Sequence, residues 1–243
     1  MNAAADARIP SDLLEDLVIA NKILFRLNVV DAFGHISVRY PGESQKYLMS
    51  RHLPPGMVTA ADIVTFDLDS NPLTHSDKPQ YSERFIHGEI YKVRPEVASV
   101  VHCHARPLIP FANVKSVKLR PMFHMCGFLG CGVPIFEIRE AGGMTDMLVR
   151  TAPLGKALAA SLGDKYIVLM RGHGATMVGE SIPEAVFRAV YAMENATIQM
   201  QAHQLAGGGE IEFLSEEESV LSGKGRNVPR AWALWKHQMT AEP

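Results

Sequence analysis

Helical and strand-like hydrophobic patterns alternate along the whole chain, and this alternation is the feature that most constrains its fold. Amphipathic helices are expected at residues 11–28, 82–93, 144–161 and 181–206. Strands are expected at residues 35–39, 61–69, 97–104, 132–136 and 166–170. Because helices and strands are interleaved throughout, the sequence predicts a layered α/β domain.

The composition is that of a globular chain with enough apolar residues for a sizeable core. Of the 243 residues, 47% are hydrophobic, and neither a linker-like tract nor an internal repeat interrupts them. We therefore predict a single domain over residues 1–243, with a polar tail from about residue 210. Two tryptophans in that tail, Trp232 and Trp235, suggest that its end docks onto the domain.

Charge and cysteine content exclude several classes of partner. The net charge is −2 with both signs interspersed, which gives no electrostatic reason to expect binding to nucleic acid or to a membrane. No apolar run is long enough to span a bilayer, and the first residues lack the apolar core of a secretion signal. The three cysteines have unrelated spacings and fit a reducing compartment. We expect a cytoplasmic protein.

The segment VVHCHARP at residues 100–107 carries two histidines at the end of an apolar strand. Side chains alternate along a strand, so His102 and His104 share one face and Cys103 points to the other. Two imidazoles on one face can ligate the same cation. Histidine pairs at this spacing also occur on ordinary strands, and the motif alone leaves both interpretations open.

Two further segments carry residue types that suit a metal centre. In RGHGA at residues 171–175, His173 stands between two glycines after a buried strand, where the backbone can turn sharply toward a ligand. Together with His102 and His104 it would give the open three-histidine sphere of catalytic metals. Glu83, near a helix start, could bind the metal or move protons, or simply interact with the helix dipole. We expect His87 and His203 on helix surfaces and His75 in solvent.

Four segments in this order, GHISVR, SERFIHGEIY, VVHCHA and RGHGA, resemble the class II aldolase/adducin family over nearly the whole chain. The resemblance implies a three-layer α/β/α domain with a mostly antiparallel central sheet. It also implies a homotetramer with active sites near subunit interfaces. It places the divalent-metal ligands at His102, His104 and His173, and the acid/base residue at Glu83.

The sequence departs from the sugar-phosphate aldolases of that family at substrate-binding positions. After Gly34, those aldolases have asparagine where this chain has His35. Ser50 matches a hydroxyl position, but Arg51 follows it where small residues are typical, and Arg171 replaces an uncharged residue. Arginine suits planar, bidentate carboxylate recognition. Alternatively, Arg51 is a surface charge and Arg171 pairs with a structural acid.

These departures resemble the branch of decarboxylases that act on hydroxylated aromatic dicarboxylates. Its substrates include 3-hydroxy-2-methylpyridine-4,5-dicarboxylate, from vitamin B6 breakdown, and dihydroxyphthalates. The resemblance thus implies a metal-dependent decarboxylase, with Mn²⁺ favoured and Zn²⁺ as the second choice. A class II aldolase acting on a hydroxy-ketone is the alternative. A non-catalytic, adducin-like binding module is a third possibility, against which the retained histidines and Glu83 argue.

Overall fold

A seven-stranded sheet forms the centre of the computed structural model, which describes residues 9–75, 77–224 and 227–241. The strands are β1 (His35–Arg39), β2 (Lys46–Ser50), β3 (Ile63–Asp67), β4 (Ser99–Cys103), β5 (Ile135–Phe136), β6 (Ile167–Met170) and β7 (Gly174–Gly179). Their order in the sheet is β3-β2-β1-β4-β7-β6-β5, and every neighbouring pair is antiparallel except β5 with β6. The expected α/β fold with a mostly antiparallel sheet is confirmed.

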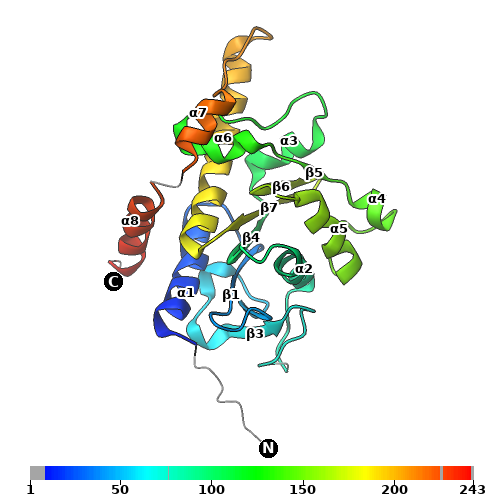
Figure 1. Cartoon of the computed structure of the whole chain (residues 1–243), viewed down its shortest axis with the longest axis vertical. Coiled ribbons are helices and arrows are strands. Elements are labelled where there is room, and N and C mark those ends of the chain that lie inside the picture. Colours follow the sequence, from blue (N-terminus) through cyan, green and yellow to red (C-terminus); the bar gives the residue numbers. More distant parts are fainter. Residues whose placement is uncertain (1–8, 76, 225–226, 242–243) are drawn as a thin grey trace, which may run out of the picture.

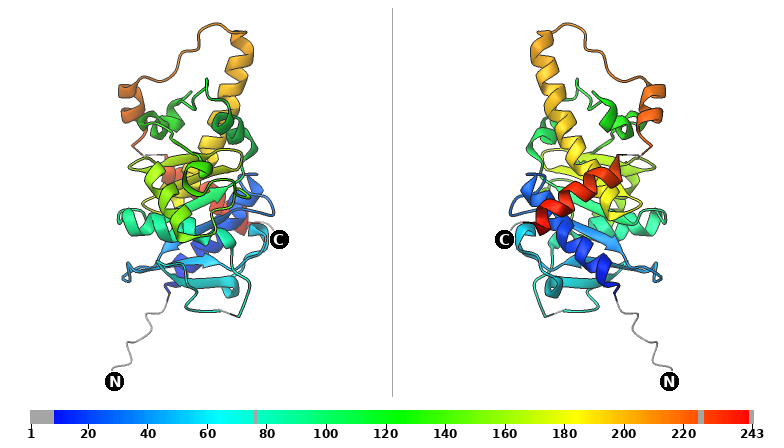
Figure 2. Two further views of the ribbon diagram at one scale, coloured as in Figure 1. Left: turned by 90° about the vertical axis from the view of Figure 1, so that its right-hand side faces the viewer. Right: turned by 90° about the vertical axis from the view of Figure 1, so that its left-hand side faces the viewer.

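Helices cover both faces of the sheet (Figure 1). They are α1 (Ser11–Arg26), α2 (Phe85–Val93), α3 (Ile109–Asn113), α4 (Ile138–Gly142), α5 (Ala152–Leu162), α6 (Ile182–Ala206), α7 (Glu216–Ser222) and α8 (Val228–Thr240). Short 3-10 turns are η1 (Pro55–Met57), η2 (Ala60–Asp62), η3 (Ser82–Arg84), η4 (Arg106–Leu108) and η5 (His124–Cys131). One face packs on α1 and α6, which α8 crosses on the outside, and the other packs on α2 and α5 (Figure 2). The sheet and the helices on its two faces form the three expected layers.

Side-chain alternation gives the two faces of β1 different characters. Ile36 and Val38 are buried in the apolar core beneath α1 and α6. His35 and Ser37 point the opposite way and form hydrogen bonds with side chains of α2. The polar residues of the central strands therefore collect under α2.

The structure differs from the sequence-based assignment in several elements. Strands β2 and β7 were not expected; both are central and almost wholly buried, so they lack the alternating pattern of a half-exposed strand. The helix expected from residue 144 begins at Ala152, with Pro153 in its first turn, where proline is tolerated. The tail contains α7 and α8, and Trp235 docks as expected, with its ring 6.2 Å from that of Tyr191.

Two expectations, one about histidine exposure and one about membrane-spanning helices, are confirmed within the described residues. His75 and His203 are exposed to solvent. No helix there combines the length and apolar character that crossing a membrane would require.

Candidate metal centre and active site

Four side chains from separate parts of the chain meet beside the ends of β4 and β7. The Nε2 atom of His104 lies 3.2 Å from Nε2 of His102 and 2.9 Å from Nε2 of His173. Oε2 of Glu83 lies 3.6 Å from Nε2 of His102 and 3.5 Å from Nε2 of His173. All four candidate ligand atoms lie within 4.8 Å of one another. The structure thus brings together the three predicted metal ligands and the predicted acid/base residue.

These separations fit a single divalent cation. Two ligands at about 2.1 Å from a metal, with an angle of about 90–110° between them, are roughly 3.0–3.4 Å apart. The distances between the imidazole nitrogens and from Glu83 to the histidines fall at or near that range. Four donors of the histidine and carboxylate type therefore form a suitable cradle, with three imidazoles and one carboxylate oxygen facing inward.

Hydrogen bonds on the far side of the rings orient two of the imidazoles. Nδ1 of His173 lies 2.9 Å from the backbone oxygen of Met147, so it carries the proton and donates it. Nδ1 of His102 lies 3.3 Å from Oγ1 of Thr176, whose own hydroxyl points to the sulfur of Met170. Oγ1 of Thr176 therefore accepts a hydrogen bond from the Nδ1–H of His102. Both rings are left with the Nε2 lone pair directed at the cluster, as metal ligation requires.

The segment between α4 and α5 holds both Glu83 and His173 through its backbone. The N–H of Val149 donates to Oε1 of Glu83 at 2.9 Å, which leaves Oε2 directed at the histidines. The carbonyl of Met147, a residue with φ of 74°, accepts from His173. The expectation of a helix from residue 144 was wrong here for a physical reason. Helical hydrogen bonding would have consumed these two backbone groups.

Two glycines allow the strands to approach closely enough to form the cluster. Gly34 has a φ of +96°, and a Cβ there would lie 2.6 Å from a methyl group of Val30 and 3.0 Å from the carbonyl oxygen of His102. A Cβ on Gly174 would lie 2.1 Å from the carbonyl oxygen of Cys103. A side chain at either position would push apart the backbones that carry His35, His102 and His173.

Burial and mutual interaction set the charge state of the cluster. Burial, together with the neighbouring His102 and His173, lowers the pKa of His104 to about 4. Burial alone would raise the pKa of Glu83, but His102 and His173 outweigh it and hold the pKa well below its usual value. Burial disfavours the charged form of His173, yet the Glu83 carboxylate raises its pKa above the ordinary value. An ionised carboxylate among imidazoles is a favourable environment for a cation.

A second set of polar side chains lies buried beside the cluster of His102, His104, His173 and Glu83, which we call the metal cluster. We call this second set (His35, His87, Ser37 and Tyr91) the buried histidine chain. Nδ1 of His35 is 2.6 Å from Nε2 of His87, whose Nδ1 is 2.6 Å from Oγ of Ser37. Oγ of Ser37 is 2.7 Å from the Tyr91 hydroxyl. The rings of His35 and His102 are 5.1 Å apart, and these residues pair directly between β1 and β4.

The expectation that His87 lies on a helix surface was wrong, because His87 is fully buried and burial lowers its pKa to about 3. A signal for this was present in the sequence. Glu83, His87 and Tyr91 are spaced by four residues, which places them on one face of a helix. His35 and Ser37 alternate on the strand that this face covers.

Comparisons with known proteins identify the family of this chain. The family model of the class II aldolase and adducin N-terminal domain matches residues 15–200. The chain belongs to this family. It is 42% identical over 240 residues to decarboxylase tropJ of Talaromyces stipitatus, covering 89% of this chain and 90% of that protein.

Two further relatives extend the comparison. A 3,4-dihydroxyphthalate decarboxylase of Terrabacter sp. is 29% identical over 218 residues, covering 85% of this chain and 86% of that protein. Among solved structures, an aldolase II superfamily protein from Pseudomonas syringae has a TM-score of 0.76 at 24% identity, covering 93% of this chain and 91% of its own. The latter likeness shows the shared fold.

The residues predicted to bind substrate in this family member are distributed around the cluster. His35 and Gly34 lie next to His102. The buried Ser50 lies by the Tyr81 hydroxyl, and the Tyr81 ring is 4.6 Å from that of His35. Continuing the β1–β2 register from the Ser37–Met49 pair places Arg51 opposite His35.

Both arginines that distinguish this chain from the sugar-phosphate aldolases already contact an acidic residue. Nε of Arg51 is 2.7 Å from Oδ1 of Asp62. Nε of Arg171 contacts Oε2 of Glu137, and its Nη2 lies 3.7 Å from the sulfur of Met147. The Arg171–Glu137 pair is the structural alternative stated above, whereas the Arg51–Asp62 pair was not expected. Carboxylate recognition by either arginine stays a prediction.

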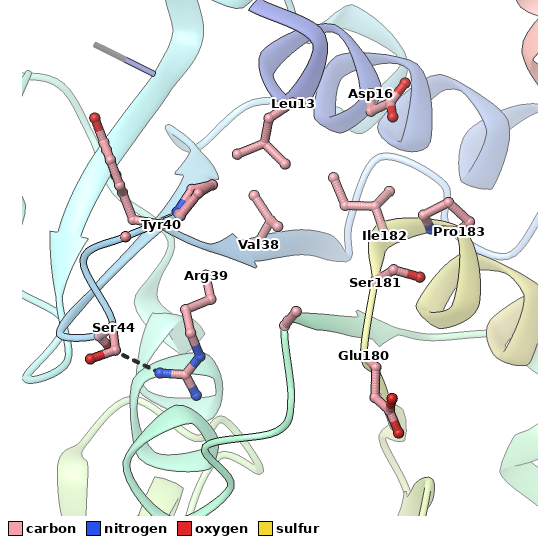
Figure 3. A pocket seen from close by; sticks show the side chains of 13 residues that line it. Leu13, Asp16, Val38, Arg39, Tyr40, Ser44, Glu180, Ser181, Ile182 and Pro183 are labelled. Carbon is pink, nitrogen blue, oxygen red and sulfur yellow. Dashed lines mark hydrogen bonds between the residues drawn. The ribbon is translucent and has the colours of Figure 1, made fainter. Parts of the chain in front are cut away.

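Two cavities differ in their relation to the metal cluster. One of about 400 Å³ is lined by His104, Arg106, Asp31 and residues 28–30, so it borders the cluster at His104. Another, of about 610 Å³, lies at the far end of β1, where Arg39 follows four residues after His35 (Figure 3). There the Arg39 guanidinium donates to four backbone carbonyls, including that of Ser44. Of these two cavities, only the smaller is lined by a member of the cluster.

Proposed function

We propose that the protein is a divalent-metal-dependent decarboxylase of a hydroxylated aromatic carboxylic acid. The observation that carries the proposal is the His102–His104–His173–Glu83 cluster, found in a chain 42% identical to a protein named as a decarboxylase. The dihydroxyphthalate decarboxylases among its relatives support an aromatic dicarboxylate as substrate. Mn²⁺ is the proposed metal and Zn²⁺ the second choice, since imidazole and carboxylate ligands accept both.

The three histidines hold the cation, and Glu83 acts beside it. When bound, the cation supplies Lewis-acid stabilisation of negative charge on a substrate oxygen. As the bond between ring and carboxylate breaks, CO₂ leaves and the ring carbon gains a proton. Oε2 of Glu83 faces the cluster while its Oε1 is fixed by Val149, so the residue is positioned to deliver that proton. His102 and His173 hold the pKa of Glu83 low, whereas burial and an anionic substrate beside it act in the opposite direction and favour the protonated carboxyl.

The cavity that borders the cluster at His104 has features that suit a planar anionic ring. Its volume of about 400 Å³ is within the range of small-molecule sites. Phe33 is 59% exposed, and its ring lies 6.4 Å from that of His104, which offers an aromatic surface next to the cluster. Arg106 lines the same cavity and forms no ion pair with the described residues. A carboxylate entering the cavity would find this cation.

The decisive test is the product formed from a small panel of compounds by the Mn²⁺-loaded protein. The panel contains 3,4-dihydroxyphthalate, 3-hydroxy-2-methylpyridine-4,5-dicarboxylate and L-fuculose 1-phosphate. We expect CO₂ from at least one aromatic acid and, in D₂O, one deuterium at the vacated ring carbon. Retro-aldol cleavage of the sugar phosphate, without CO₂ from any aromatic acid, would replace this proposal with the aldolase alternative.

We predict that Arg171 contributes to binding of a substrate carboxylate. Arg171→Lys keeps the charge but loses the bidentate geometry, so kcat/KM should fall about tenfold or more, as expected from the ~1.5–3 kcal/mol of a charged hydrogen bond. Arg139→Lys is the matched control, because Arg139 contacts the same Glu137 carboxylate at 2.7 Å. If Arg171→Ala and Arg139→Ala both leave kcat/KM unchanged, Arg171 is structural and Arg51 becomes the candidate.

A further inference from the structure

The hydrogen bonds of the buried histidine chain can run in either of two directions, because each member can be a donor or an acceptor. In the first arrangement, Tyr91 donates to Ser37, Ser37 to His87, and His87 through Nε2 to Nδ1 of His35. In the second, every bond is reversed, and the Tyr91 hydroxyl donates to the backbone oxygen of Ala98 instead.

The distances favour the first arrangement. The Tyr91 hydroxyl is 2.7 Å from Oγ of Ser37 but 3.5 Å from the oxygen of Ala98, which is at the outer limit of a hydrogen bond. Burial raises the pKa of Tyr91, so the phenol keeps its proton and must donate it. Only in the first arrangement do the protons of Tyr91, Ser37 and His87 all have an acceptor 2.6–2.7 Å away.

The first arrangement determines the tautomer of His35. Its Nδ1 accepts from His87, so the neutral ring carries its proton on Nε2. This Nε2 has no hydrogen-bond partner among the residues that the structure describes. The His35 ring lies on the same face of the sheet as His102, 5.1 Å from its ring. The chain thus ends in an unused N–H donor beside the metal ligands.

We propose that Nε2–H of His35 is a fixed hydrogen-bond donor to an anionic oxygen of the substrate, and that Ser37 and His87 are the positioning residues that hold this tautomer. The identity of the substrate rests on the function proposed above, whereas the assignment of the His35 tautomer does not. A carboxylate or phenolate oxygen accepts such a bond. If Nε2 of His35 carried a lone pair instead of a proton, it would repel that oxygen. The assignment also makes His35 a donor rather than a fourth imidazole ligand of the cation.

Nuclear magnetic resonance of ¹⁵N-histidine-labelled, Zn²⁺-loaded protein tests the tautomer directly. Long-range proton–nitrogen correlations distinguish a protonated from an unprotonated ring nitrogen, and comparison with His35→Gln assigns the His35 signals. We expect Nε2 protonated and Nδ1 unprotonated for both His35 and His87. A His35 ring protonated on Nδ1 would overturn the proposal.

A pair of serine variants tests the positioning role. Ser37→Ala breaks the chain, so the His35 nitrogen shifts should move toward the average of the two tautomers. KM for 3,4-dihydroxyphthalate should rise at least roughly threefold, with a smaller change in kcat. Ser99→Ala is the matched control: Ser99 is equally buried and donates to the backbone oxygen of Ser37 at 2.8 Å, but lies outside the chain.

The two measurements separate this inference from the proposed function. If Ser37→Ala and Ser99→Ala give the same His35 spectrum as the parent protein, the positioning role is wrong whatever the enzyme acts on. If no aromatic acid is decarboxylated while His35 keeps its proton on Nε2 and responds to Ser37→Ala, the proposed function fails and the tautomer assignment stands.

Discussion

Replacing His104 with alanine is expected to empty the metal site and abolish turnover. His104 is partly buried and lines a cavity, so its truncation opens a gap at the cavity surface rather than in the core. Metal affinity should fall by more than about 100-fold, since even partners that only orient a ligand typically contribute 10–100-fold. Metal analysis after dialysis against Mn²⁺ and CO₂ release from the same samples measure both effects.

Thermal unfolding provides a readout of metal binding that does not depend on turnover. At about 100 times its Kd, Mn²⁺ should stabilise the parent protein by ~2.7 kcal/mol and raise its Tm, whereas His104→Ala should show no shift at that concentration. His203→Ala is the control, because His203 is exposed on α6 and should keep metal, shift and activity. A His104→Ala protein with a full complement of metal and normal turnover would contradict the three-histidine site.

The histidines of the metal cluster could be singled out from local patterns in the sequence, and the family resemblance then joined them into one site. His102 and His104 are two residues apart at the end of an apolar strand, and His173 stands between two glycines after another. The strand assignment needed one correction, since β4 ends at Cys103 and His104 lies just beyond it. The two Nε2 atoms nevertheless lie 3.2 Å apart.

The backbone support of the cluster could not be predicted in the same way. Residues 144–151 resemble the start of a helix by composition, yet they form the loop whose Met147 and Val149 hold His173 and Glu83. Hydrogen bonds from a main-chain group to a residue far along the chain leave no mark on side-chain periodicity. Pro153 was the available local signal, since it belongs in the first turn of a helix.

The burial of His87 depended on combining two weak patterns from separate segments. Its spacing of four from Glu83 and from Tyr91 defines a polar helix face, and His35 with Ser37 defines a polar strand face. Taken alone, each of these polar patterns predicts a solvent-exposed face. Only their pairing in the fold buries both and satisfies their hydrogen bonds, as a buried polar network requires.

Glu83→Gln is expected to lower kcat at least ~100-fold while the three histidines still bind the metal. The amide is isosteric, and its oxygen can still accept the Val149 N–H that fixes Oε1, so the loop and helix keep their places. What the amide cannot do is carry and release a proton at Oε2. Single-turnover CO₂ release, deuterium incorporation and a separate substrate titration distinguish lost chemistry from lost binding.

Glu89→Gln supplies a closely matched control for that experiment. Glu89 lies six residues further along the same helical segment, and both glutamates are 6% exposed. Its carboxylate pairs with Lys92 at 2.6 Å rather than with the cluster, so kcat should be unchanged. A Glu83→Gln enzyme that decarboxylates at nearly the parent rate would remove Glu83 as the proton donor. The three histidines would keep their role, because their geometry does not depend on the proton that Glu83 carries.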